Sequence, residues 1–187
     1  MILGEEFFDR PSPEVARDLI GKILWRAGVG GGRLSEVEAY LPEGDAASHA
    51  ARGQTPRNRP MFSGPGHIYV FLNYGVHNLL NIVCDEEGVG SAVLIRSYEP
   101  LEYDSGKHSG ACGPGRVGRT LGVSKDMSGA RLGEDWGFYV LDDGCAPVVD
   151  ACTRIGLSDG QELPLRYCLA GSTWVTKSPR RNGGKDR

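Results

Sequence analysis

The chain has 187 residues with a formal net charge of −3, and 40% of its residues are hydrophobic. This length and composition are typical of one compact globular domain and exclude a disordered chain. No apolar run approaches the roughly 18 residues of a membrane-spanning helix. The N-terminal segment carries acidic residues where a signal peptide has basic ones. We therefore expect a cytoplasmic protein without a membrane anchor.

Cysteines and charges restrict the kind of site that the chain can hold. Five cysteines, at positions 84, 112, 145, 152 and 168, include no CxxC pair, so we expect free thiols and no metal site. The negative net charge does not indicate nucleic-acid binding. Basic residues nevertheless cluster in residues 52–59 and 177–187. Such patches can bind phosphate on an acidic protein, although a solvated surface explains them as well.

The first predicted elements are a helix and a strand. An amphipathic helix over residues 12–23 would have Ser12 as its N-cap and Pro13 at its first helical position. A glycine-rich turn at 28–32 then leads into a strand over residues 33–41. Apolar residues alternate there with Glu36, Glu38 and Tyr40. One face of this strand would therefore be apolar, and the other would carry two carboxylates and a phenol.

The rest of the chain predicts strands, loops and one short helix. Residues 42–66 predict a long loop, which in a compact domain is usually functional or mobile. Strands over 67–72 and 76–84 would be joined by a tight turn that leaves Tyr74 at an exposed tip. We expect further strands at 91–97, 136–141 and 165–175, a loop at 102–112, and a helix at 114–121 closed by Gly122. The sequence thus predicts one α+β domain over 1–176 and a basic, flexible tail over 177–187.

Four side chains could carry chemistry, but each has an ordinary structural explanation. Glu38 could be a general base in a sheltered pocket, or an exposed carboxylate on an edge strand. His49 lies in a loop and could be a surface residue. Tyr74 could be a wedge or a packed turn aromatic, and Arg96 could face a site or form a surface salt bridge. Only their joint arrangement points to a function.

Several motifs occur in one order along the chain. They are EVEAYL (36–41), SHA (48–50), QTPRNRPMF (54–62), PGHIYV (65–70), NYGVHNLLNIV (73–83), VLIRSYEPLE (93–102), GPGR (113–116) and GSTWV (171–175). With the N-terminal FFDRPSPEVARDLIGKIL, they resemble the alkyladenine (3-methyladenine, methylpurine) DNA glycosylase family over nearly the whole chain. The resemblance implies a mainly antiparallel, curved sheet flanked by helices, with a protruding β-hairpin.

The resemblance also implies an activity. A monofunctional DNA glycosylase would flip alkylated or deaminated purines out of duplex DNA and hydrolyse the N-glycosidic bond, which initiates base excision repair. Glu38 matches the residue that activates the attacking water, and Arg96 matches the arginine that positions this water. A backbone carbonyl near Ile155 would be a third contact of the water. Tyr74 matches the wedge that fills the vacated gap from the minor groove.

The same resemblance gives a base pocket and a set of partners. Tyr40, His49 and Phe71 fall where the family stacks the flipped base, and Asn81 falls where it excludes guanine by crowding the 2-amino group. We expect no cofactor, double-stranded DNA containing damaged purines as the partner, and a monomer. Cationic bases such as 3-methyladenine leave readily, so they require no general acid. The sequence names no proton donor for neutral bases.

Three positions depart from the family pattern. Phe71 stands where the family often has Tyr, and His77 replaces an aromatic residue. The segment 102–112 carries only Lys107 and His108 where relatives often have several arginines. We therefore expect the DNA backbone to be bound by other arginines, namely Arg52, Arg57, Arg59, Arg116 and Arg119.

Two other classes of protein would share some of these features. A catalytically silent damaged-DNA-binding protein would keep the pocket, but we would expect it to have lost Glu38 or Arg96. A hydrolase of free nucleosides would have no use for a tyrosine wedge at position 74. Both classes are therefore less favoured than the glycosylase.

Overall fold

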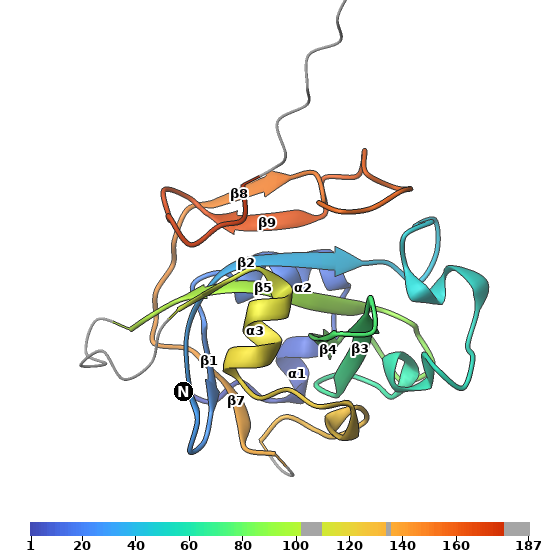
Figure 1. The fold of residues 1–187 in the computed structure, drawn as a ribbon, viewed down its shortest axis with the longest axis horizontal. Helices are drawn as coiled ribbons and strands as arrows, with labels where there is room; N and C mark the ends of the chain where they lie inside the picture. The colour runs from blue at the N-terminus through green and yellow to red at the C-terminus, as the bar shows by residue number, and fades with distance from the viewer. Residues whose placement is uncertain (102–109, 134–135, 178–187) are drawn as a thin grey trace, which may run out of the picture.

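The computed structural model describes residues 1–101, 110–133 and 136–177. In this part of the chain nine strands form one curled sheet in which every strand pair is antiparallel, and short helices pack around it (Figure 1). The predicted α+β class is confirmed. Lys107, His108 and most of the predicted loop at 102–112 lie outside the described residues, as does the tail beyond Lys177.

The secondary structure follows the chain in this order. The strands are β1 (Ile23–Arg26), β2 (Gly30–Tyr40), β3 (Ile68–Asn73), β4 (His77–Val83), β5 (Ala92–Glu99), β6 (Ala111–Cys112), β7 (Phe138–Leu141), β8 (Val149–Cys152) and β9 (Arg166–Leu169). The α-helices are α1 (Glu5–Phe8), α2 (Ser12–Leu19) and α3 (Pro114–Thr120). Three 3-10 helices are η1 (His49–Arg52), η2 (Arg59–Phe62) and η3 (Lys125–Met127). None of the helices in the described ranges is long and apolar enough to cross a membrane.

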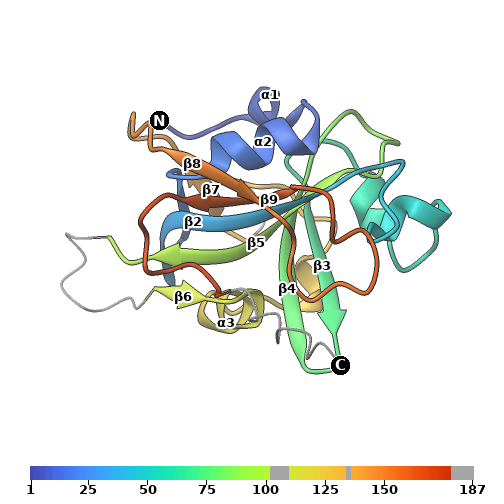
Figure 2. The same ribbon diagram turned by 90° about the horizontal axis from the view of Figure 1, so that it is seen from above.

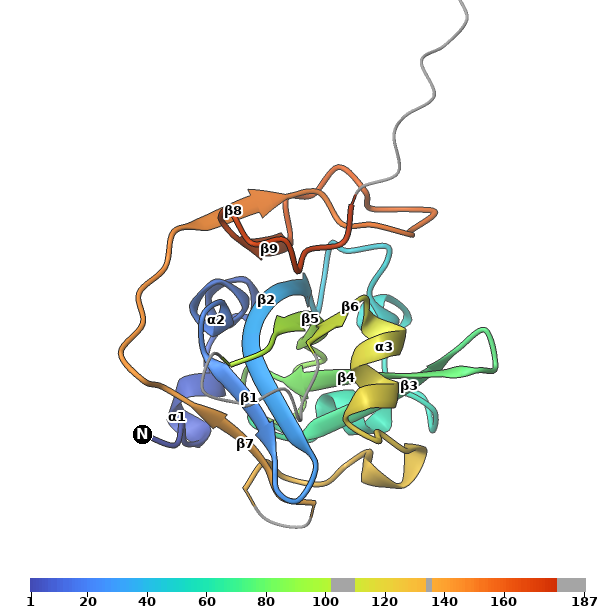
Figure 3. The same ribbon diagram turned by 60° about the vertical axis from the view of Figure 1, so that its left-hand side comes forward.

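Strand β2 lies at the centre of the sheet, whose main order is β3-β4-β5-β2-β1-β7. One edge of β2 pairs with β5 along most of its length. Its other edge pairs first with β1 and then, over Glu36 to Glu38, with β9. The β8–β9 ribbon therefore lies beside the part of β2 that carries the two carboxylates and is joined to it edge to edge, as Figures 1 and 3 show. Because β2 has neighbours on both edges, Glu38 does not lie on an edge strand.

The polar residues of β2 lie inside the protein, although its pairing with β5 is irregular around Glu36. The pairing with β5 shifts between Leu34 and Glu36 and again between Glu36 and Val37. Val37 lies in the main hydrophobic core, and Glu36 and Glu38 are both 0% exposed. The predicted alternation is correct, but both faces of this strand are buried.

The hairpin β3–β4 projects from the body of the molecule (Figures 2 and 3). In its turn the Val76 N–H donates to the Asn73 carbonyl at 3.1 Å. Tyr74 and Gly75 have φ values of 50° and 72°, as a type I′ turn requires at both central positions. Tyr74 is 87% exposed. The predicted hairpin with an exposed Tyr74 is confirmed.

The first predicted helix is shorter than expected, and its cap was assigned wrongly. It ends at Leu19, because Gly21 takes a φ of 86° and directs the chain into β1. Pro11, rather than Ser12, occupies the N-cap position. The Ser12 hydroxyl donates instead to the Tyr40 carbonyl at 3.0 Å, which ties α2 to the end of β2.

Other predicted elements differ mainly in length. The strands expected at 136–141 and 165–175 are reduced to the four residues of β7 and of β9, and the loop at 42–66 contains η1 and η2. The helix at 114–121 is confirmed as α3. The short strands β1, β6 and β8 were not predicted, because two to four residues show no clear period and form strands only through long-range pairing.

Candidate active site

One pocket brings together the side chains that the sequence singled out. Its volume is about 310 Å³, and Glu38 and Arg96 lie in its wall. The other predicted members of the site that line it are Tyr40, His49, Phe71, Tyr74 and Asn81. They come from β2, β3, β4, β5 and η1, so the curled sheet and the long loop after β2 together form the cavity.

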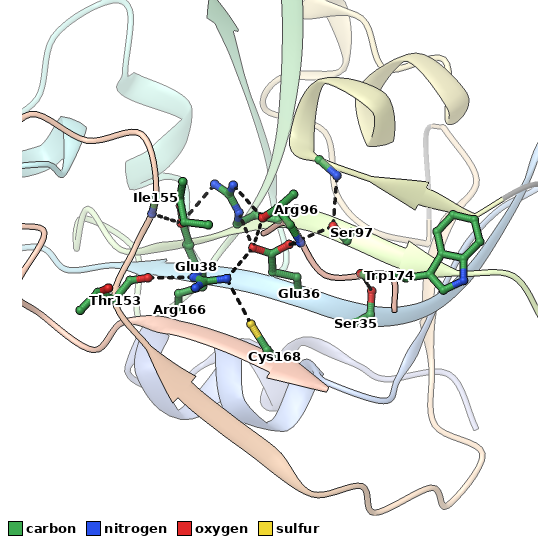
Figure 4. A network of polar contacts seen from close by, with 12 residues as sticks. Ser35, Glu36, Glu38, Arg96, Ser97, Thr153, Ile155, Arg166, Cys168 and Trp174 are labelled. Atoms are coloured by element: carbon green, nitrogen blue, oxygen red, sulfur yellow. Dashed lines mark hydrogen bonds and ion pairs between the residues drawn. The ribbon is translucent and has the colours of Figure 1, made fainter. Parts of the chain in front are cut away.

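The carboxylate of Glu38 is held by three groups, two of which, Arg96 and Ile155, are seen in Figure 4. Its Oε1 forms an ion pair with Arg96 Nη1 at 3.1 Å and accepts a hydrogen bond of 3.0 Å from the Ile155 N–H. Its Oε2 accepts a hydrogen bond of 3.0 Å from the Tyr40 hydroxyl. The alternative of an exposed carboxylate is therefore wrong. Instead, a fully buried anion faces the pocket in a fixed orientation.

Arg96 is the cation of this site and not part of a surface salt bridge. Its side chain is 8% exposed and lies between two buried carboxylates, with Nε at 2.9 Å from Glu36 Oε1 and Nη1 next to Glu38. Burial acts to lower the pKa of Arg96, but the charges of Glu38 and Glu36 outweigh it, so the pKa is raised. Arg96 therefore stays a cation that neutralises part of the charge on Glu38.

Aromatic rings form a wall of the pocket beside the carboxylate. The ring centroids of His49 and Phe71 are 4.3 Å apart with an interplanar angle of 55°. His49 Nδ1 lies 2.9 Å from the Tyr69 hydroxyl. Burial, and then the charge of Arg57, lower the pKa of His49, so its ring is neutral near pH 7. Burial, above all, together with the charge of Glu38 raises the pKa of Tyr40 well above its usual value, so the hydroxyl keeps the proton that it donates to Glu38.

Asn81 lies in the pocket wall with a fixed side-chain amide. Its Nδ2 donates to the backbone carbonyls of Tyr69 and Leu79, at 3.1 and 3.3 Å. The side chain is 8% exposed and cannot turn without losing both bonds. An amide that cannot turn can exclude bases by shape, which is consistent with the role expected for Asn81.

The five arginines expected to bind the DNA backbone are all solvent-exposed. Three follow His49 in or beside η1 and η2, and two lie on α3, whose Pro114 lines the pocket. The guanidinium carbon of Arg57 lies 5.1 Å from the centroid of the Phe71 ring, which is the contact of a cation with an aromatic face. His77 packs against Gly115 at the start of α3. Arg57 therefore lies directly against a pocket residue, and Arg116 lies two residues after another one, Pro114.

Sequence reasoning missed two buried ion-pair systems next to the site. Glu36 binds Arg96 and Arg166, and Arg154 forms a doubly hydrogen-bonded pair with Asp45 at 2.6 Å for each bond. The sequence did contain a signal for the Glu36 system. Glu36 and Glu38 alternate with apolar residues, which places both carboxylates on one face of the strand. No sequence signal joins Asp45 to Arg154, which lie 109 positions apart.

The described residues show no group of three or more His, Cys, Asp or Glu side chains that could hold a metal ion. All five cysteines are free thiols. The polar groups of the pocket are therefore one carboxylate, one guanidinium, three phenols, an imidazole, amides and the backbone. This set suits proton transfer and the stabilisation of a cation.

Comparisons with known proteins point to one family. A model of the family described as methylpurine-DNA glycosylase matches residues 6–173. Proteins from Burkholderia lata, Rubrobacter xylanophilus and Methanocella arvoryzae are 40%, 46% and 41% identical to the chain. These alignments cover 94%, 90% and 88% of this chain and 91%, 93% and 89% of the respective relatives. Each relative bears the name "Putative 3-methyladenine DNA glycosylase". The chain belongs to the methylpurine-DNA glycosylase family.

Proposed function

We propose that this chain flips damaged purines out of duplex DNA and hydrolyses their N-glycosidic bond with a water activated by Glu38. Membership of the family makes the chain a DNA glycosylase, an enzyme that hydrolyses N-glycosyl bonds. The observation that carries the mechanism is the buried Glu38 carboxylate, held by Arg96 and the Ile155 amide in the wall of an aromatic pocket.

The size of the pocket fits one base. Its volume of about 310 Å³ is at the lower end of the range for small-molecule sites, which run from roughly 300 to 1,000 Å³. Rings of Tyr40, His49 and Phe71 line it, and rings stack on the flat face of a purine. A base inside duplex DNA cannot reach such a pocket, so the nucleotide must leave the stack first.

The two oxygens of Glu38 have different surroundings. Oε1 is engaged by Arg96 and by the Ile155 N–H, while Oε2 accepts one hydrogen bond, from Tyr40. A carboxylate oxygen can accept a second hydrogen bond. Oε2 is therefore the atom that takes the proton of the attacking water, and the water oxygen forms the new bond to C1′ of the sugar.

The charge of the site suits the reaction. Cleavage of the glycosidic bond passes through a sugar with oxocarbenium character, which a nearby carboxylate stabilises. The bond electrons leave with the base. A cationic base such as 3-methyladenine departs neutral and needs no proton. No lysine is among the described residues that line the pocket, which supports hydrolysis by water rather than attack by an amine.

Tyr74 supports the flipping step. It is 87% exposed at the tip of the hairpin, yet it also borders the pocket. An apolar or aromatic wedge that enters the minor groove can occupy the gap left by an extruded nucleotide. A ring at this place would keep the base in the pocket while the bond is cleaved.

Single-turnover release of bases tests the proposal. Duplexes would carry one 3-methyladenine analogue, hypoxanthine or 1,N6-ethenoadenine, with an undamaged duplex alongside. We expect release of at least one damaged base without strand cleavage. We also expect Glu38→Gln to lose about 10²-fold or more in rate, because a general base typically contributes that much.

Binding of the same duplexes distinguishes the outcomes. Glu38→Gln should bind damaged DNA as tightly as the wild type does, because the amide keeps the shape of the pocket. Binding by the wild type without release of any base would identify a silent damaged-DNA-binding protein. An unchanged rate in Glu38→Gln would remove Glu38 from its role and leave the glycosylase activity in place.

A further inference from the structure

Glu36 is a second buried carboxylate beside the site. It lies two residues before Glu38 on the same face of β2, and its side chain is 0% exposed. It does not line the pocket, so it reaches neither a bound base nor the attacking water. Any effect of Glu36 on the reaction must therefore pass through the groups that it binds.

Five hydrogen bonds from described residues converge on this carboxylate (Figure 4). Its Oε1 accepts from Arg96 Nε at 2.9 Å, Arg166 Nη1 at 3.1 Å and the Thr176 hydroxyl at 2.5 Å. Its Oε2 accepts from the Ser97 hydroxyl at 3.0 Å and the Thr176 N–H at 2.7 Å. Burial acts to raise the pKa of Glu36, but the charge of Arg96 and the bonds from Thr176 outweigh it and the pKa is lowered. Glu36 therefore remains an anion.

The first path from Glu36 to the reaction runs through Arg96. Glu36 binds the Nε atom, and Nη1 of the same guanidinium lies 3.1 Å from Glu38 Oε1. A guanidinium is planar and rigid, so fixing Nε also fixes the direction of Nη1. Glu36 thus orients the cation that Glu38 faces.

The second path runs through Arg166 to the backbone. Arg166 binds Glu36 through Nη1 and donates from Nε to the Thr153 carbonyl at 2.8 Å. Two residues later, the Ile155 N–H donates to Glu38 Oε1 at 3.0 Å. Glu36 therefore also supports the loop segment that supplies the second donor to Glu38.

We propose that Glu36 is a positioning residue for base excision, because it aligns both donors of Glu38 Oε1, the Arg96 guanidinium and the Ile155 amide. The inference rests on the proposed function, in which Oε2 of Glu38 takes the proton from water. Holding Oε1 from two sides keeps Oε2 turned toward the pocket. Glu36 is also a second anion beside Arg96 and Arg166, so these two cations do not fully neutralise the charge of Glu38.

The test measures the release rate and the dissociation constant separately, on the hypoxanthine, ethenoadenine or 3-methyladenine-analogue duplex that the wild type cleaves fastest. We expect Glu36→Gln to lose about tenfold or more in single-turnover rate, the size expected for a lost hydrogen bond to a charged group. Its dissociation constant for the damaged duplex should stay within about twofold of the wild-type value, because Glu36 lies outside the pocket. Glu99→Gln is the matched control. It removes a carboxylate from the same sheet, one that binds Ser172, and should leave the rate unchanged.

A double variant separates positioning from a general loss of structure. The inference requires Glu36 to orient Arg96, so Glu36→Gln should cost much less in an Arg96→Ala background than in the wild type, because the two losses are coupled. If the rate losses of the two single variants multiply in the double variant, the inference is overturned. A wild-type release rate in Glu36→Gln would also overturn it, and so would an equal loss of release rate and of affinity for the damaged duplex. A wild type that releases no base overturns the proposed function itself and the positioning role with it.

Substitutions at Thr176 keep the inference testable if Glu36→Gln fails to fold. Thr176 is partly exposed and donates to Glu36 from both its hydroxyl and its N–H. Thr176→Val removes the hydroxyl, which donates to Glu36 and accepts from Arg96 Nη2 at 3.3 Å, and should slow release by about threefold or more. Thr176→Ser restores the donor and should restore the rate. Equal rates for the two variants would overturn the inference.

Discussion

The Ile155 amide donates a 3.0 Å hydrogen bond to the carboxylate of Glu38, although the two residues lie 117 positions apart. The segment that follows Ile155, Gly156 and Leu157, lines the same pocket. The chain from β8 to β9 therefore completes a site that begins on β2. This contact ties the carboxylate that we propose as the general base to the chain between β8 and β9.

The proposed role of Tyr74 as a wedge at the hairpin tip gives the first prediction. Tyr74→Ala should weaken binding of a damaged duplex by about fivefold or more, because a lost aromatic stack is worth roughly 1–3 kcal/mol. The rate of release at saturation should also fall, since fewer bound nucleotides stay flipped. Val148→Ala is a control, because Val148 is 74% exposed and lies outside the pocket. Wild-type binding and wild-type single-turnover rates in Tyr74→Ala would rule out the wedge.

The buried pair of Asp45 and Arg154 should contribute to stability. Both side chains are 0% exposed, and two hydrogen bonds of 2.6 Å join them. Asp45→Asn leaves a buried guanidinium without its anion, so the free energy of unfolding should fall by about 3–5 kcal/mol. Asp143→Asn, which breaks the more exposed pair with Arg33, should cost about 1 kcal/mol or less. Urea unfolding of the two variants measures both free energies of unfolding. Similar decreases in the two variants would mean that the buried Asp45–Arg154 pair contributes no more to stability than the exposed pair.

His49 should make stability depend on pH. Its pKa is lowered in the folded protein, by burial first and then by Arg57. The unfolded chain therefore takes up a proton at a higher pH, so the contribution of His49 is complete above the unfolded pKa of about 6.5 and is lost as the pH falls through the folded pKa.

The variant His49→Phe tests this expectation, because it keeps a ring against Phe71 but cannot take up a proton. Its melting temperature should fall less than that of the wild type between about pH 8 and about pH 5.5, the range over which a histidine titrates. Thermal unfolding at several pH values measures the difference. If the melting temperatures of the two proteins change with pH in parallel, protonation of His49 does not affect stability.

Binding of undamaged DNA should depend strongly on salt. Each phosphate contact made by an arginine releases counterions, and makes the slope of log affinity against log salt concentration more negative by about 0.9. Arg57→Ala and Arg59→Ala should each reduce the magnitude of this slope by about one, because both side chains are exposed. Arg17→Ala, on α2 away from the pocket, should not change it. A wild-type slope near zero would refute this picture of DNA binding.

Local sequence determined the elements whose geometry depends on neighbouring residues. The Asn-Tyr-Gly turn predicts a hairpin tip because Gly75 accepts a positive φ, and Tyr74 is indeed exposed there. The alternation around Glu36 and Glu38 predicts a strand because side chains on a strand point to opposite faces in turn. The order of motifs along the chain also determined the family, and with it the expected site residues.

Only the tertiary structure decided what surrounds those residues. Burial of Glu38 follows from strands on both edges of β2, and one of these partners, β9, comes about 130 positions later in the chain. The pairing of Asp45 with Arg154 and of Glu36 with Arg166 depends in the same way on how the β8–β9 ribbon lies beside β2. Hydrogen bonds and burial at such distances depend on the whole sheet, so no local pattern of residues encodes them.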